Sequence, residues 1–165
     1  MIIEVWTKEK YSVNEEAGLI GRLAHAGLPV KTARLSRLYK IEAPFHKKDF
    51  DRIAAELLTD KITERYSLSA RPALFPKGPK RCARPGLKKF YRVEVWLKNS
   101  VTDVVGESVK EAIRDIMGGQ PRNVRFGRAY YIACGSESRL KRAVSTTLMN
   151  EIVNVYRVTK GKAKG

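Results

Sequence analysis

The sequence contains few of the residues that usually carry enzyme chemistry. Its 165 residues include two histidines and two cysteines, too few for a disulfide framework, so we expect both thiols to be reduced. No phosphate-binding glycine loop and no Gly-x-Ser-x-Gly elbow occurs. His25 and His46 have no partner at metal-ligand spacing, and a solvated or helix-capping role fits each better. We therefore predict no catalytic residue, no metal site and no cofactor in this chain.

Long apolar segments are also missing. No hydrophobic run approaches the roughly 18 residues that a membrane-spanning helix needs. The first residues alternate Ile3 and Val5 with polar side chains, unlike a secretory signal. These patterns predict a cytoplasmic protein that does not enter the membrane.

Acidic residues are absent from two segments, and this absence explains the basic character of the chain. Residues 69–91 and 157–165 contain no Asp or Glu and carry eleven of the sixteen net positive charges. The remaining segments are close to neutral. A nucleic-acid partner is therefore not the expected one, although the formal charge of +16 at first points to it.

What the sequence does contain is an internal repeat. Residues 3–6 (Ile-Glu-Val-Trp) return as residues 93–96 (Val-Glu-Val-Trp), and residues 34–41 return in similar form as residues 125–132. A third block around residues 58–68 returns around residues 148–158. Three blocks in the same order at an offset of 90 or 91 indicate two copies of one small unit.

Hydrophobic periodicity predicts the same elements in both copies. The first copy shows strands at 1–8, 30–43 and 62–68, with helices from Asn14 to about Gly27 and over residues 50–58. The second shows strands at 91–98, 122–134 and 152–159, a helix that Asp103 caps and Gly118 ends, and a helix over 140–148. Each copy is therefore predicted to be β-α-β-α-β. Glu4 and Glu94 alternate with apolar residues on the first strands, and we expect them to face solvent.

These elements predict a two-layer α/β (α+β) fold with antiparallel sheets. We expect repeat 1 at residues 1–68, a basic linker with four prolines at 69–89, repeat 2 at 90–159 and a basic tail at 160–165. Units of this size bury too little surface to be stable alone. The two repeats are therefore expected to pair with each other about a pseudo-twofold axis.

One recurring block contains the candidate contact residues. Arg34, Arg37 and Tyr39 in the first copy correspond to Arg125, Arg128 and Tyr130 in the second. Because side chains alternate along a strand, Arg128 and Tyr130 share one face and Arg125 lies on the other. The block is either a solvated strand edge, where basic residues discourage aggregation, or a contact for a partner or an anion.

Four ordered blocks of the second copy resemble the PurS family, the small subunit of phosphoribosylformylglycinamidine (FGAM) synthase. The resemblance rests on the opening strand 91–98, an Asp-x-x-Gly helix start at 103–106, a Val-Arg-x-Gly-Arg strand at 124–128 and a closing block at 148–156. The first copy is looser, with Ser36 in place of Gly127. Members of the family are usually single short domains that pair as homodimers, whereas this chain has two copies in tandem.

The resemblance implies a subunit without catalytic activity of its own inside a glutamine- and ATP-dependent carbon–nitrogen ligase. It implies a scaffold between a PurQ-type glutaminase and a PurL-type synthetase that supports ammonia transfer in purine biosynthesis. The positions that match the family blocks are Arg125, Arg128 and Asn150, with Arg34, Arg37 and Asp60 as their first-copy counterparts. We expect these six residues to bind partners, while further homodimerisation stays open.

Two other functions remain as alternatives. Small α/β sheets that carry arginine and aromatic side chains can bind single-stranded nucleic acid by stacking. A tandem regulatory domain that senses a small molecule is the second alternative, for which no ligand motif is seen in the sequence.

Overall fold

The computed structural model describes residues 1–70 and 90–161. The first half contains β1 (Ile2–Thr7), α1 (Val13–His25), β2 (Ala33–Glu42), α2 (Lys47–Ile53), a π-helical turn η1 (Ala54–Leu58) and β3 (Glu64–Ser69). The second half contains β4 (Phe90–Leu97), α3 (Val104–Met117), β5 (Asn123–Ile132), α4 (Glu137–Thr147) and β6 (Asn154–Gly161). Both halves follow the predicted β-α-β-α-β order. Residues 71–89 of the predicted linker and 162–165 of the predicted tail lie outside the described part.

One six-stranded sheet runs through both halves, in the order β3-β1-β2-β5-β4-β6. All of its strand pairs are antiparallel. If each strand is replaced by its counterpart in the other half, the same strand order is read from the opposite edge of the sheet. The register agrees, because Val5 pairs with Arg37 and the counterpart Val95 pairs with Arg128. The predicted α+β class, antiparallel sheet and pseudo-twofold relation are confirmed.

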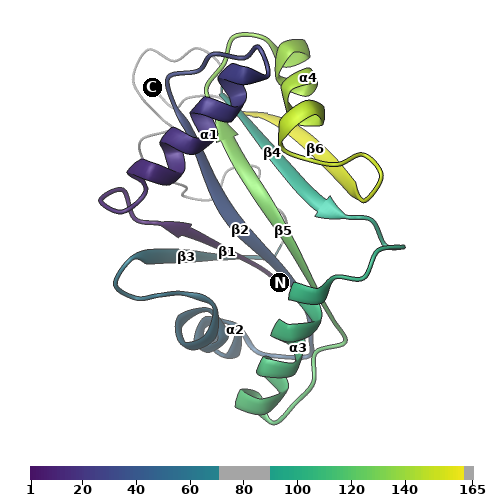
Figure 1. The fold of residues 1–165 in the computed structure, drawn as a ribbon. Coiled ribbons are helices and arrows are strands. Elements are labelled where there is room, and N and C mark those ends of the chain that lie inside the picture. The colour runs from purple at the N-terminus through teal and green to yellow at the C-terminus, as the bar shows by residue number, and fades with distance from the viewer. Residues whose placement is uncertain (71–89, 162–165) are drawn as a thin grey trace.

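All four helices lie on one face of the sheet (Figure 1). The strand residues that pack against them share one side of each strand, for example Tyr39 and Ile41 of β2 or Tyr130 and Ile132 of β5. This alternation follows from the pleat of a β-strand. The helices α1 and α4 cover one end of this face, and α2 and α3 cover the other.

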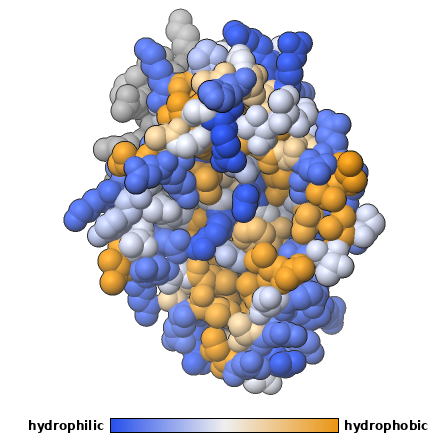
Figure 2. Space-filling view, in the orientation of Figure 1, coloured by the Kyte–Doolittle hydropathy of each residue, from blue (hydrophilic) through white to orange (hydrophobic). Residues whose placement is uncertain are grey.

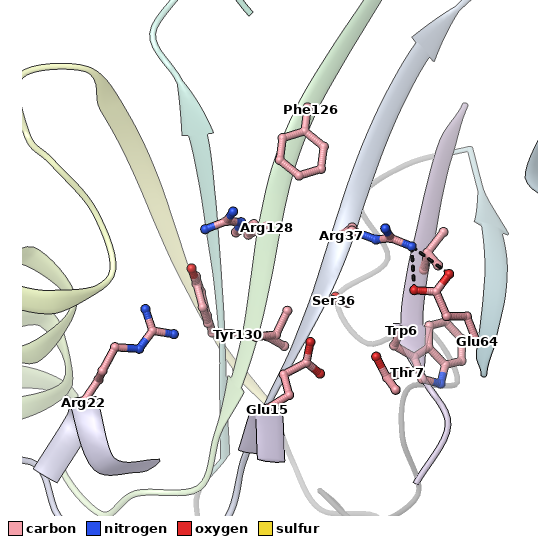
Figure 3. A pocket seen from close by; sticks show the side chains of 12 residues that line it. Trp6, Thr7, Glu15, Arg22, Ser36, Arg37, Glu64, Phe126, Arg128 and Tyr130 are labelled. Carbon is pink, nitrogen blue, oxygen red and sulfur yellow. Dashed lines mark hydrogen bonds and ion pairs between the residues drawn. The ribbon is translucent and has the colours of Figure 1, made fainter. Parts of the chain in front are cut away.

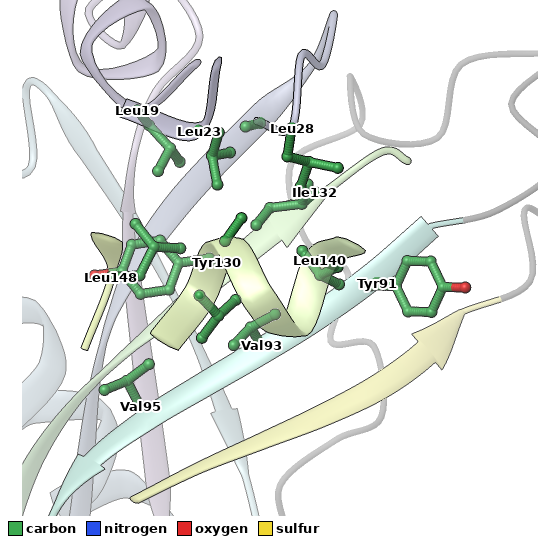
Figure 4. Packing of buried hydrophobic residues seen from close by; sticks show 13 residues of the cluster. Leu19, Leu23, Leu28, Tyr91, Val93, Val95, Tyr130, Ile132, Leu140 and Leu148 are labelled. Carbon is green, nitrogen blue, oxygen red and sulfur yellow. The ribbon is translucent and has the colours of Figure 1, made fainter. Parts of the chain in front are cut away.

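Each hydrophobic core is built from both repeats. In one core, α1 of the first repeat packs with α4 of the second (Figure 4); its buried residues include Leu19, Leu23, Val93, Tyr130, Ile132, Leu140 and Val144. In the other core, Ile113 of α3 packs with elements of the first repeat; its buried residues include Ile3, Tyr39, Ile41, Phe50, Ile53 and Val124. Neither repeat therefore contains a complete core.

The Asp-x-x-Gly block fixes where α3 begins. One oxygen of Asp103 accepts from the Gly106 backbone N–H at 2.8 Å, and the other accepts from the Phe126 N–H at 2.6 Å. A Cβ on Gly106 would lie 2.5 Å from the backbone oxygen of Val124. Glycine is thus required because the first turn of α3 touches β5. Gly118 ends the helix with a φ of 66°, as a C-terminal glycine does.

The last strand of each repeat begins and ends later than predicted, at Glu64–Ser69 and Asn154–Gly161. Strand β6 continues to Gly161 because Lys160 and Gly161 pair with β4, so the predicted boundary at Thr159 is corrected by two residues. Ile62 and Ile152 lie in turns before the last strands and not within them. No helix in the described residues has the length and apolar character needed to cross a membrane.

The shared cores predict that the halves depend on each other. Cleavage of the chain within residues 75–85 should leave the two fragments associated, while either fragment expressed alone should not fold cooperatively. Size-exclusion chromatography and chemical denaturation of the cut and uncut chains would check this. Fragments that separate after cleavage, or that unfold cooperatively on their own, would contradict the exchange of helices between the cores.

Candidate functional site

The two arginine blocks lie at the centre of the sheet. Strands β2 and β5 pair with each other, and Arg37 stands directly opposite Arg128. Each of these residues is the counterpart of the other, so the pair marks the pseudo-twofold axis. The interpretation as a strand edge is therefore wrong: β3 and β6 form the edges of the sheet, because each repeat places its long second strand against the other repeat.

The two axial arginines have different partners. Arg37 donates to both carboxylate oxygens of Glu64, at 2.7 and 2.8 Å, and to the backbone oxygen of Leu58 at 3.3 Å. At an offset of 90, the counterpart of Glu64 is Asn154, a neutral residue. The side chain of Arg128 is exposed, and its guanidinium has no hydrogen-bond or ion-pair partner within residues 1–70 and 90–161. One guanidinium is neutralised and the other is not.

A pocket of about 340 Å³ opens beside this pair (Figure 3). Its wall combines apolar residues of the sheet with charged residues of both repeats and of α1; it is lined by Val5, Trp6, Thr7, Glu15, Arg22, Leu35, Ser36, Arg37, Glu64, Phe126, Arg128 and Tyr130. On this face of the molecule, hydrophilic side chains occupy the middle and hydrophobic residues lie next to them (Figure 2). Three arginines and two glutamates make the pocket basic.

Glu15 is the acidic residue of α1 in this pocket. Burial raises the pKa of its carboxyl above the usual value of 4.5, against the opposing influence of Arg34 and of a hydrogen bond with Thr7. As the pH falls, Glu15 therefore takes up a proton at a higher pH than an ordinary surface glutamate does.

Arg34 and Arg125 each donate a hydrogen bond to the backbone at the end of the neighbouring strand. Arg34 is 2% exposed, donates to the backbone oxygen of Thr7 at 2.8 Å and pairs with Glu16 at 3.1 Å. Arg125 donates to the backbone oxygen of Leu97, the counterpart of Thr7. The proposal of Arg34 as a partner contact is corrected, because its guanidinium is enclosed by β1 and the start of α1.

Asp60 and Asn150 shape the turns before the last strands. The Asp60 carboxylate accepts from the backbone N–H of Ile62 at 2.7 Å, and the Asn150 side chain accepts from the N–H of Ile152 at 2.9 Å. These backbone bonds lower the pKa of Asp60. Both turns are exposed, so this structural role leaves them accessible to a partner.

The opposite face of the sheet holds a buried ionic cluster. Glu4 accepts from Arg92 at 2.9 Å, from the Tyr131 hydroxyl at 2.5 Å and from the Ser36 hydroxyl at 2.5 Å. Arg92 also pairs with Glu94 at 2.9 Å. The expectation that Glu4 and Glu94 face solvent is wrong: they are 3% and 4% exposed, because each carboxylate finds charged partners inside.

This cluster connects the two repeats. Glu4 belongs to β1, whereas Arg92 and Tyr131 belong to β4 and β5. Burial alone would lower the pKa of Arg92, but the neighbouring Glu4, Tyr131 and Glu94 together raise it above its usual value. The guanidinium therefore stays charged.

The repeat contained signals that could have located both sites. Arg92 and Tyr131 have Ile2 and Lys40 as counterparts, and Glu64 has Asn154. At these positions the two copies have side chains of different charge, and this difference breaks the pseudo-symmetry. The roles of Arg22 and Glu15 had no such signal, since only the folded arrangement brings α1 to the axis. Within the described residues, no three His, Cys, Asp or Glu side chains cluster as a metal site would require.

The fold and the sites define a two-layer α/β protein made of two paired repeats. Residues 91–162 match the model of the PurS family, described as phosphoribosylformylglycinamidine (FGAM) synthase. This match covers the second repeat and leaves residues 1–90 outside it. PurS of B. subtilis matches with 23% sequence identity and a TM-score of 0.42, over 45% of this chain and 99% of the PurS chain. No curated protein matches the chain.

The buried cluster predicts a large effect of removing one ion. Arg92→Ala should lower the free energy of unfolding by about 3–5 kcal/mol, because it leaves Glu4 buried without a cation and Glu94 with only Arg157, at 3.4 Å. Urea denaturation would measure the change. Arg142→Ala, at an exposed position of α4, serves as the control and should change stability by less than about 0.5 kcal/mol. Similar small losses in both variants would contradict the structural role of the cluster.

The raised pKa of Glu15 predicts a dependence of stability on pH. The folded chain holds this proton more tightly than the unfolded chain, so ionisation of Glu15 costs stability as the pH rises above about 4.5. Glu15→Gln should therefore raise the melting temperature at neutral pH, and the gain should shrink toward pH 4. A gain that grew on acidification would show that Glu15 is stabilised as a carboxylate.

Proposed function

We propose that this chain is a non-catalytic scaffold subunit of FGAM synthase in purine biosynthesis. It would lie between a glutaminase subunit of the PurQ type and a synthetase subunit of the PurL type, in the cytoplasm. The observation that carries the proposal is the match of residues 91–162 to the PurS family. The pairing of a second, similar repeat with this one in a single sheet supports it.

A scaffold between two active sites has a clear physical task. Ammonia released at one site must reach the other without being protonated in bulk water. Rigid positioning of the two enzymes serves this aim, because a small displacement of reacting groups can cost a large part of the rate. The continuous sheet, the shared cores and the buried Glu4–Arg92 pair give the chain the rigidity that this role requires.

The turns before β3 and β6 are suitable surfaces for two partners. Ile62 is 72% exposed and Ile152 is 79% exposed. Each follows the side chain that caps its turn, Asp60 or Asn150. Both repeats expose a large apolar residue at this equivalent place. Burial of these side chains in an interface would lower the free energy of the complex. The pseudo-twofold axis provides one such surface in each half.

The set of proposed contact residues is therefore smaller than the set of six that the sequence predicted. Asp60 and Asn150 lie in the exposed turns, and Arg128 is exposed beside the axis. Arg37 and Arg125 are partly accessible but engaged with Glu64 and Leu97. Arg34 is left out because it is buried.

Reconstitution with the cognate glutaminase and synthetase tests this proposal. The chain alone should show no turnover with formylglycinamide ribonucleotide, glutamine and ATP. Its addition should restore glutamine-dependent turnover of the two enzymes, and ammonia-dependent turnover should respond less because that route bypasses the glutaminase. Unchanged glutamine-dependent turnover with and without the chain would refute the scaffold role.

Variants of the turns sharpen the test. Ile62→Asp and Ile152→Asp should each weaken assembly and glutamine-dependent turnover, since a charge replaces an apolar contact. Val104→Asp is a matched control, because Val104 is 70% exposed but lies at the start of α3. Equal effects of all three substitutions would remove the turns from the proposed interface.

A further inference from the structure

We propose that the pocket beside Arg37 and Arg128 is a binding site for a small phosphate monoester. This inference goes beyond the scaffold role and does not depend on it, since it concerns a site within the isolated chain. It gives a structural basis to the regulatory alternative that the sequence left without a ligand motif.

The first argument is the electrostatics at the axis. Side chains directly opposite each other in an antiparallel pair lie about 5 Å apart at Cβ, and like charges there are destabilising. Arg37 and Arg128 are such a pair. Glu64 neutralises Arg37, but Asn154 supplies no carboxylate to Arg128. The uncompensated guanidinium gives this position an affinity for an anion.

The second argument is a further arginine that points to the same place. Arg22 of α1 lines the pocket, is exposed, and has no ion pair within the described ranges. Figure 3 shows the guanidinium groups of Arg22 and Arg128 on the same side as the Tyr130 hydroxyl. Two unpaired guanidinium groups match the dianion of a phosphate monoester. Arginine binds phosphate through paired N–H donors, which adds geometric selectivity to the charge.

The third argument is the apolar part of the wall. Val5, Leu35 and Phe126 line the pocket without charge. A volume of about 340 Å³ lies at the lower end of the roughly 300–1,000 Å³ range of small-molecule sites. A bare ion would leave this apolar part unfilled. The wall therefore favours a phosphate attached to a compact organic body.

Calorimetric titration of the full chain with ribose 5-phosphate tests the proposal. We expect saturable binding of ribose 5-phosphate, weaker binding of inorganic phosphate, and none of ribose. Arg128→Gln and Arg22→Gln should each weaken binding about tenfold or more, because each removes a charge-assisted hydrogen bond. Chemical-shift changes should be largest at the backbone amides of Leu35 and Phe126.

Two further variants make the outcome decisive. Arg142→Gln removes the same charge at an exposed position of α4 outside the pocket and should leave the affinity unchanged. Asn154→Glu keeps Arg128 but gives it the carboxylate that Glu64 gives Arg37, and should weaken binding about as much as Arg128→Gln does. Melting curves of all variants would show that they fold.

Several results would overturn the proposal. Absence of saturable binding at millimolar ribose 5-phosphate is one, and an equal loss in Arg142→Gln, which would indicate unspecific attraction, is another. Tighter binding of succinate than of ribose 5-phosphate would assign the pocket to carboxylates, such as the acidic side chains of a protein partner. Full affinity in Asn154→Glu would show that Arg128 does not hold the anion.

Discussion

The antiparallel pairing of β2 with β5 is the contact on which the rest of the structure depends. It runs from Ala33 opposite Ile132 to Glu42 opposite Asn123 and joins two three-stranded halves into one sheet. Only on this common sheet can α1 and α3 pack against the other repeat. The same pairing places Arg37 and Arg128 on the axis and brings Glu4 within reach of Arg92.

The repeat sets the architecture, and the departures from it provide the chemistry. A Cβ on Gly127 would lie 2.5 Å from the Trp96 ring, so this position must be glycine. Its counterpart Ser36 has a side chain and donates its hydroxyl to Glu4. The exchange of Glu64 for Asn154 likewise leaves one axial arginine neutralised and the other free. Each of these differences changes the electrostatics in one repeat only.

Duplication within one chain has a consequence for the proposed roles. Two identical chains paired about a twofold axis must present the same residues on both sides. Two repeats in one chain can keep the paired fold and still diverge, as Asp60 and Asn150 or Glu64 and Asn154 have done. This freedom suits a scaffold that meets two different subunits, and it allows a single anion site beside the axis.

The sequence by itself determined the repeat, the order of elements and the approximate positions of their ends, because hydrophobic periodicity and caps such as Asp103 and Gly118 act locally. It also pointed to the arginine blocks. Only the tertiary structure decided that β2 and β5 are central, that Arg34 is internal and that Glu4 is buried. Whether a strand is central or at an edge, and whether a charge is buried, depends on partners far away in the chain. Arg92 lies 88 residues from Glu4, and no local pattern specifies such a contact.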